Sequence, residues 1–235
     1  MEKEVTNLSG IAMEVRKKKN RFKMKEKIEF YDEIFSTEKN HWRRDLHKTF
    51  DDYFIDIIVE NYDSKYHKTF LEIGCGDGRF FDTAFKKLKE LKLELSGVDL
   101  SSNAIELAKR KERPIKFICD EYLGWLKEQE SFDVIYSRGT FEHFENIESV
   151  LEQTKNILSS NGFFLMSVPN NLGYDINKND QTESFRELNG GSHQIEWHLF
   201  LETWNKIIDK VGFDKVFFRG FDERIGFNWI LTIRK

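Results

Sequence analysis

The chain has 235 residues, a net charge of -4 and a hydrophobic fraction of 39%. This length suits one α/β domain with additional segments, or at most two small domains. Its 22 Phe, 7 Tyr and 5 Trp provide enough apolar surface for a packed core. The charged fraction of 33% is typical of a soluble protein. No apolar run approaches the roughly 20 residues that span a bilayer, so we expect no membrane partner.

Two features of the sequence bear on the compartment. The chain has only two cysteines, Cys75 and Cys119, which are too few for a disulfide framework or a structural zinc site. Each follows a strand-like run, so we expect both to be reduced and buried. Residues 1–5 lack the basic and then apolar pattern of a secretory signal. These observations predict a cytoplasmic protein.

A lysine-rich run covers residues 16–27 near the start of the chain. Such a run predicts a solvated face of a frayed helix. A nucleic-acid docking element is the alternative interpretation. The acidic balance of the whole chain and the absence of a second comparable basic cluster in the sequence disfavour it. We therefore expect no nucleic-acid partner.

The next part of the chain alternates short strands and helices. Apolar residues at helical spacing predict a helix from about residue 45 to 62. The predicted strands are 68–73, 93–98, 115–119, 132–136, 162–168, 213–219 and 226–233, and the predicted helices are 79–91, 102–111, 121–129, 146–159 and 200–211. This alternation predicts a doubly wound α/β fold, with a parallel sheet and helices on both faces. Only residues 220–225 separate the last two strands, so this pair must form an antiparallel hairpin.

Three glycines at alternate positions, Gly74, Gly76 and Gly78, join the first predicted strand to the helix that follows it. Glycines at such a turn let the backbone bend sharply and let a ligand approach closely. The first N–H groups of the helix then point toward that ligand. The pattern indicates a nucleotide-like ligand at the carboxyl edge of a parallel sheet.

The residues around this glycine turn favour one kind of ligand. Position 79 is arginine, so the Gly-x-Gly-x-x-Gly dinucleotide fingerprint is incomplete. Glu72 lies two positions before the first glycine, and a pyrophosphate group disfavours a nearby negative charge. A cationic ligand with an amino-acid head group favours such a carboxylate. The turn therefore indicates a ligand other than NAD.

Two further acids follow the next predicted strands. Asp99 ends the second strand, where a carboxylate can accept hydrogen bonds from both ribose hydroxyls. Ser101 or Ser102 then caps the following helix. Asp120 ends the third strand, where it can accept a hydrogen bond from an adenine amino group or cap the next helix. Carboxyl ends of parallel strands share one sheet edge, so both acids are expected beside the glycine turn.

Glu142 and His143 follow the fourth predicted strand, near the place where a reacting centre is expected.

Residues 169–199 break the alternation of strands and helices, and a loop of this length in a compact domain is usually functional or disordered. The loop carries His193 and His198. Aromatic residues in it, such as Tyr174, are candidates for an acceptor pocket, and the N-terminal segment around Tyr31, Trp42 and Arg43 is expected to form a wall of the site.

In this order, the motifs resemble those of the class I S-adenosylmethionine (SAM)-dependent methyltransferases of the small-molecule branch. The matching segments are 71–78, 97–101, Asp120, 132–136, 141–144, 158–162, 168–170 and 198–200. The resemblance covers about residues 67–235. It implies a Rossmann-like sheet of seven mostly parallel strands with a C-terminal antiparallel hairpin. It also implies a division into an N-terminal helical segment, 1–65, and a methyltransferase domain, 66–235, with a substrate lid at about 169–199.

The resemblance implies SAM as the cofactor and S-adenosylhomocysteine (SAH) as the product. The implied cofactor-binding residues are Glu72, Gly74, Cys75, Gly76, Gly78, Asp99, Leu100, Asp120, Glu121 and Ser137. In the related quinone O-methyltransferases, a Glu-x-x-Glu-His set can bind a metal. Gly139 occupies the first acidic position here, so we expect no metal.

His143 is the first candidate for a general base, and His193 and His198 are its competitors. The alternative is that Glu142 and His143 form a structural pair that fixes the turn into the next helix. We expect methyl transfer to an O or N atom of a small polar metabolite, such as a sugar or a nucleotide-sugar. Methylation of RNA or protein docked by the basic N-terminal run, a non-catalytic cofactor-binding protein and a nicotinamide enzyme are the alternatives.

Overall fold

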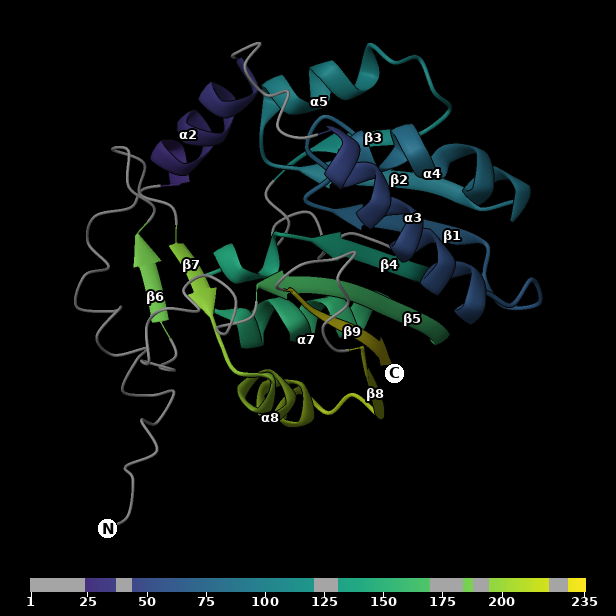
Figure 1. Cartoon of the computed structure of the whole chain (residues 1–235), viewed down its shortest axis with the longest axis vertical. Helices are drawn as coiled ribbons and strands as arrows, with labels where there is room; N and C mark the ends of the chain where they lie inside the picture. The colour runs from purple at the N-terminus through teal and green to yellow at the C-terminus, as the bar shows by residue number, and fades with distance from the viewer. Residues whose placement is uncertain (1–23, 37–43, 121–130, 170–183, 188–194, 220–227) are drawn as a thin grey trace.

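The computed structural model describes residues 24–36, 44–120, 131–169, 184–187, 195–219 and 228–235 (Figure 1). The helices are α2 (Met24–Ser36), α3 (Arg44–Asn61), α4 (Arg79–Glu90), α5 (Ser102–Lys109), α7 (Ile147–Ile157) and α8 (Leu201–Val211), with a 3₁₀ helix η3 (Phe141–His143). The strands are β1 (Thr69–Ile73), β2 (Glu94–Asp99), β3 (Lys116–Cys119), β4 (Phe132–Arg138), β5 (Leu158–Pro169), β6 (Ser184–Glu187), β7 (Ile195–His198), β8 (Lys215–Arg219) and β9 (Asn228–Arg234).

Seven strands form one sheet in the order β3-β2-β1-β4-β5-β9-β8. Strands β1 to β5 pair in parallel, whereas β9 is antiparallel to both of its neighbours, β5 and β8. The predicted doubly wound sheet with a C-terminal hairpin is therefore confirmed. The strand order reverses between β1 and β4, and ligands of such sheets bind at the carboxyl edge beside this reversal.

Apolar side chains fill a core on each face of the sheet. In Figure 1, α3, α4 and α5 cover one face, and α7 and α8 cover the other. Along β4, Val134 and Tyr136 belong to the first core and Ile135 to the second, as the alternation of side chains along a strand requires. Burial on both faces explains why the central strands are continuous apolar runs.

At the amino ends of the strands, the carboxylate of Asp133 joins β1, β4 and β5. One of its oxygens accepts hydrogen bonds from the N–H groups of Lys68 (2.8 Å) and Thr69 (3.0 Å) and from the Thr69 hydroxyl. The other oxygen accepts from the Ser159 hydroxyl at 2.8 Å. Burial alone would raise the pKa of Asp133, but these hydrogen bonds outweigh it and lower the pKa. Asp133 is thus fixed as a carboxylate.

The structure differs from the sequence prediction at three places. Strand β5 begins at Leu158, four residues before the predicted start, because Leu158 pairs with Phe132 ahead of a register shift in β4. The segment 169–199, which we expected to be a loop, contains the antiparallel pair β6 and β7. Cys75 is buried as expected, but Cys119 is exposed because it ends β3, the edge strand of the sheet.

Several predicted features lie outside the described residues: the basic run 16–23, Trp42 and Arg43, the predicted helix 121–129, and Tyr174. Within the part of the chain that is described, none of the helices has the length and apolar content of a membrane span.

Candidate functional site

The glycine turn between β1 and α4 has a backbone that only glycine adopts readily. Gly74, Gly76 and Gly78 have φ angles of 72°, 51° and 70°. The N–H groups of Gly74 and Cys75 donate to the Val98 carbonyl at 2.9 and 3.1 Å, so the turn is fastened to β2. A Cβ atom on Gly74 would lie 2.1 Å from Oγ1 of Thr140. The glycine therefore permits a close approach between the end of β1 and the segment after β4.

Asp99, at the carboxyl end of β2, is held beside this turn. Its Oδ2 accepts from the Gly76 N–H at 2.8 Å, and its Oδ1 accepts from the Ser101 N–H at 2.9 Å. Burial raises the pKa of Asp99 while these amide hydrogen bonds oppose the shift. A carboxylate has about four acceptor positions, so capacity remains for the hydroxyl groups of a ligand.

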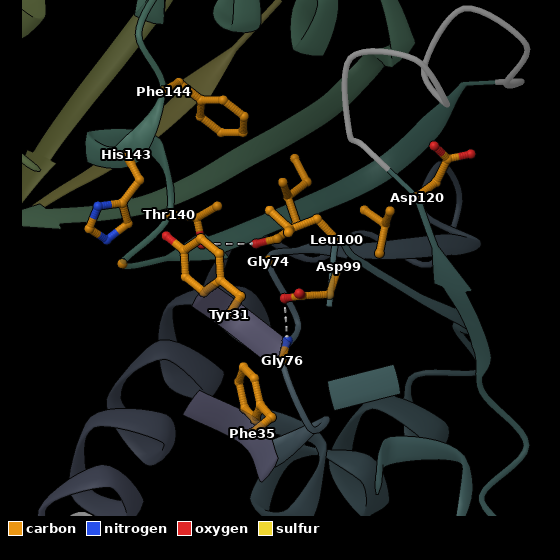
Figure 2. A pocket seen from close by; sticks show the side chains of 13 residues that line it. Tyr31, Phe35, Gly74, Gly76, Asp99, Leu100, Asp120, Thr140, His143 and Phe144 are labelled. Atoms are coloured by element: carbon orange, nitrogen blue, oxygen red, sulfur yellow. Dashed lines mark hydrogen bonds between the residues drawn. The ribbon is translucent and has the colours of Figure 1, made fainter. Parts of the chain in front are cut away.

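A cavity of about 200 Å³ opens between the carboxyl ends of the strands and α2 (Figure 2). It is lined by Tyr31, Phe35, Ile73, Gly74, Gly76, Val98, Asp99, Leu100, Asp120, Gly139, Thr140, His143 and Phe144. Six of the predicted site residues therefore meet in one cavity: Gly74, Gly76, Asp99, Leu100, Asp120 and His143. Tyr31, which we expected in a wall, lines it as well.

Four further predicted site residues that the structure describes, Glu72, Cys75, Gly78 and Ser137, are not part of the cavity lining. Glu72, Cys75 and Ser137 are buried behind its wall, and the Ser137 hydroxyl donates to the Ile73 carbonyl at 3.0 Å. Gly78 caps α4 in the left-handed conformation. The last residue of β7 is His198, and β7 lies beside η3, which carries His143. Glu121 and His193 lie outside the described residues.

A buried charged cluster lies beneath the glycine turn, and the sequence did not reveal it. Glu72 of β1 is adjacent to Tyr136 of β4 in the sheet. The guanidinium of Arg138 donates to Oδ1 of Asp51, from α3, at 2.5 Å. Thr83 of α4 donates to the other oxygen of Asp51 at 3.3 Å. The cluster therefore joins β1, β4, α3 and α4.

The cluster holds more carboxyl groups than cations. Burial raises the pKa of Asp51 to about 6, although Arg138 opposes the shift. Burial also raises the pKa of Glu72 well above its ordinary range. Within the described residues, Oε2 of Glu72 and the hydroxyl of Tyr136 are buried without a hydrogen-bond partner. The unpaired oxygen of Glu72 therefore lies beneath the turn, outside the lining of the cavity.

His143 approaches the cavity from the side opposite α2, as Figure 2 shows. Its Nε2 lies 3.9 Å from Oε1 of Glu142, whose side chain is buried. The ring of Phe144 packs edge-to-face on Phe141 at 5.6 Å between centroids, and Phe141 belongs to the core. The buried ring of Phe141 thus holds the 3₁₀ helix η3 to the core, while His143 of the same helix lines the cavity.

These residues fit the parts of SAM. The sequence predicts that Asp99 binds the ribose, Leu100 the face of the adenine and Asp120 its polar edge, and all three residues line the cavity. The glycine turn lets the end of a ligand approach the backbone after β1 closely. Arg138 and Asp51 were missed as partners because they are 87 positions apart in the chain. The predicted fourth strand ends at residue 136, so Arg138 was not recognised as part of β4, which ends at Arg138 in the structure.

The sequence profile of a family described as a methyltransferase domain matches residues 35–216, and the chain belongs to this family. It is 30% identical over 115 residues to malonyl-[acyl-carrier protein] O-methyltransferase of Bacillus cereus, covering 48% of this chain and 42% of that protein. It is 26% identical over 170 residues to phosphoethanolamine N-methyltransferase 2 of Caenorhabditis elegans, covering 69% of this chain and 36% of that protein. The chain thus spans less than half of the length of either relative.

Solved structures share the fold. The DhpI–SAH complex superposes with a TM-score of 0.63 at 15% identity, covering 89% of this chain and 95% of that one. Magnesium protoporphyrin IX methyltransferase (ChlM) from Synechocystis PCC 6803 with bound SAH gives a TM-score of 0.58 at 16% identity, covering 81% and 84%. The family match confirms the predicted methyltransferase family, and these neighbours confirm the predicted class I methyltransferase fold.

Proposed function

We propose that this protein transfers the methyl group of SAM to an O or N atom of a small polar metabolite. One observation carries the proposal: His143 and Phe144, after β4, line the same cavity as Asp99 and Leu100, at the end of β2. A cofactor whose ribose is held at Asp99 then extends toward His143 across the strand reversal. The metabolite is proposed to enter from the side of His143 and Tyr31.

The chain's own contribution to the reaction is positioning. Bound SAM supplies an electrophilic methyl group on a sulfonium leaving group. The glycine turn and Asp99 fix one end of the ligand, and the apolar rings of Phe144 and Phe35 keep water from the reacting atoms. Holding two reactants in line contributes on the order of 7–11 kcal/mol to the barrier reduction. An amine acceptor that arrives unprotonated needs little beyond this alignment.

A hydroxyl acceptor also needs a base. His143 is proposed for this role, because an imidazole at the cavity wall can take the acceptor's proton during transfer. Glu142, 3.9 Å from its Nε2, is placed to stabilise the imidazolium that results. His198 and His193 are the competing candidates. Their test is the comparison of His143→Gln with His198→Gln and His193→Gln in the same assay.

The acceptor class draws on the relatives. Their names describe O-methylation of malonyl-[acyl-carrier protein], N-methylation of phosphoethanolamine and, for the 28% identical protein of Pelagibacter ubique, O-methylation in ubiquinone biosynthesis. A carboxylate, an amine and a ring hydroxyl, each on a free small molecule, are therefore the acceptor groups to assay first. A sugar or nucleotide-sugar is a further candidate, because the predicted lid 169–199 carries aromatic residues suited to a ring.

The test uses SAM with a labelled methyl group and two fractions of a cell extract, one of small molecules and one of macromolecules. The proposal predicts label in the small-molecule fraction. Label in protein or RNA alone would contradict it and favour the alternative in which the basic run 16–27 docks a macromolecule. SAH binding without transfer to either fraction would favour a non-catalytic cofactor-binding protein.

A further inference from the structure

Helix α2 forms one wall of the cofactor cavity. Tyr31 and Phe35, one turn apart on this helix, both face the cavity (Figure 2). The ring of Phe35 packs on the glycine turn so closely that a Cβ atom on Gly76 would lie 3.0 Å from its Cζ. A helix that precedes the whole sheet in sequence therefore completes the site. The contacts that hold α2 against the rest of the protein therefore determine whether the cavity is closed on this side.

Asp32 lies between these two aromatic residues and faces the start of α5 instead. Its Oδ1 accepts from the Ser101 hydroxyl at 2.6 Å and from the Asn103 N–H at 3.1 Å, and its Oδ2 accepts from the Ser102 hydroxyl at 3.2 Å. The Asn103 side chain donates back to the Asp32 carbonyl at 2.9 Å. One residue thus joins α2 to α5 by four hydrogen bonds.

The chemistry of this contact favours an ionised aspartate. The unpaired N–H groups at a helix N-terminus attract a negative charge. Burial alone would raise the pKa of Asp32, but the hydrogen bonds from Ser101 and Asn103 outweigh it and lower the pKa. The Ser101 hydroxyl also accepts from the Ala104 N–H at 3.1 Å, as the cap of α5. Asp32 therefore binds a helix end that is already ordered.

The contact connects directly to the ribose acid. The N–H of Ser101 donates to Oδ1 of Asp99, while its hydroxyl donates to Asp32. Asp99 in turn accepts from Gly76, on which Phe35 packs. Hydrogen bonds therefore connect Asp32 to Ser101, Ser101 to Asp99, and Asp99 to Gly76. Because Phe35 of α2 packs on Gly76, this chain of contacts begins and ends on α2.

We infer that Asp32 is a positioning residue for the cofactor, which clasps α2 to α5 so that Tyr31 and Phe35 retain SAM and SAH in the cavity. The inference rests on the proposed function for the identity of the ligand and adds how that ligand is retained. Because Asp32 does not line the cavity, it acts through Ser101 and through the position of α2. Its loss is expected to speed cofactor dissociation and to leave the transfer step unchanged.

The test measures SAH affinity by calorimetry and SAH release by stopped-flow displacement in Asp32→Ala and Asp32→Asn. Hydrogen bonds to a charged group are strong, so Asp32→Ala is expected to weaken SAH binding by about tenfold or more, mostly through faster release. Asp32→Asn keeps a side-chain acceptor and should be intermediate. The KM for SAM should rise in parallel while kcat is retained, a split that general loss of structure would not produce.

Glu33→Gln is the matched control, because Glu33 is the next residue of α2 and is exposed. It should bind SAH as the wild type does. Unchanged affinity and release in Asp32→Ala would overturn the clasp, as would equal weakening in Glu33→Gln. If Asp32→Ala loses its helical signal in circular dichroism, SAH affinity and release are measured in Asp32→Asn and Ser102→Ala instead. Unchanged values in both variants would then overturn the clasp. A wild-type protein that binds no SAH would overturn the proposed function as well as the clasp.

Discussion

The carboxylate of Asp99 accepts a hydrogen bond from the backbone N–H of Gly76 at 2.8 Å, which joins the end of β2 to the glycine turn after β1. The acid proposed for the ribose and the turn proposed for the amino-acid tail are therefore one structural unit. A change in either is expected to disturb both.

Gly74→Ala should abolish or strongly weaken SAH binding. An alanine at φ 72° is strained by roughly 1–2 kcal/mol, and its Cβ would also overlap Thr140 at 2.1 Å. Either the turn or the wall formed by Thr140 must move, and both border the cavity. Calorimetric titration with SAH measures the loss.

Gly212→Ala is the control for this substitution. Gly212 has a φ of 80° at the end of α8, and the atom nearest to an added Cβ, at 3.2 Å, is the flexible end of Lys155. It carries the same strain without touching the cavity. Its SAH affinity should equal that of the wild type, and a comparable loss there would show that strain alone explains Gly74→Ala.

His143→Gln should lower kcat by about 10²–10⁴-fold if the acceptor is a hydroxyl, which is the usual contribution of a general base. SAH affinity should change little, because a base acts on the acceptor. The measurement is steady-state methyl transfer together with SAH calorimetry on the same protein. Unchanged kcat would contradict a general-base role for His143. It would favour the alternative that Glu142 and His143 form a structural pair, with His198 or His193 as the base.

The buried cluster gives the protein a pH-dependent stability. Asp51 has a pKa of about 6 in the folded chain, against 3.8 as its ordinary value, because it is buried. Its contribution to stability is full below about pH 3.8 and is lost as pH rises through about 6. The total change is on the order of 3 kcal/mol. Urea unfolding of wild type and Asp51→Asn between pH 4 and 7 measures it.

In Asp51→Asn this contribution should be absent, so the difference in unfolding free energy between the two proteins changes across that range. Asp56→Asn, on the exposed side of α3, should follow the wild type. A constant difference between wild type and Asp51→Asn would contradict the raised pKa.

Asp133→Asn should destabilise the sheet by about 2–3 kcal/mol at pH 7, since it removes the charge that accepts hydrogen bonds from Lys68, Thr69 and Ser159. The pKa of Asp133 is lowered, so its stabilisation is present above the ordinary value and lost as pH falls through the folded pKa. Urea unfolding at pH 7 and in acid measures this, with exposed Asp214→Asn as control. Equal stability of the two variants at pH 7 would contradict it.

The sequence predicted the parts of the molecule that depend on neighbouring residues. The alternation of strands and helices follows local hydrophobic patterns, and the glycine turn, Asp99 and Asp120 stand at strand ends that any parallel sheet brings to one edge. These elements and the mostly parallel sheet with its C-terminal hairpin could therefore be predicted. The start of β5 at Leu158 could not, because its pairing with Phe132 lies across a register shift.

The remaining parts of the site depend on contacts between distant residues. Asp32 and Ser101 are 69 positions apart, and Asp51 and Arg138 are 87 apart. A polar residue in an amphipathic helix looks the same whether it faces water or another helix end. Only the folded chain shows that Asp32 clasps α5 and that Asp51 is buried against Arg138.

The central claim is that the cavity beside Gly74 and Asp99 binds an adenosyl cofactor. Calorimetric titration of the wild-type protein with SAH, and separately with NAD, tests it most directly. The structure predicts one SAH bound for each chain, no heat from NAD, and loss of SAH binding in Gly74→Ala. Binding of NAD in place of SAH, or no SAH binding by a folded protein, would contradict it.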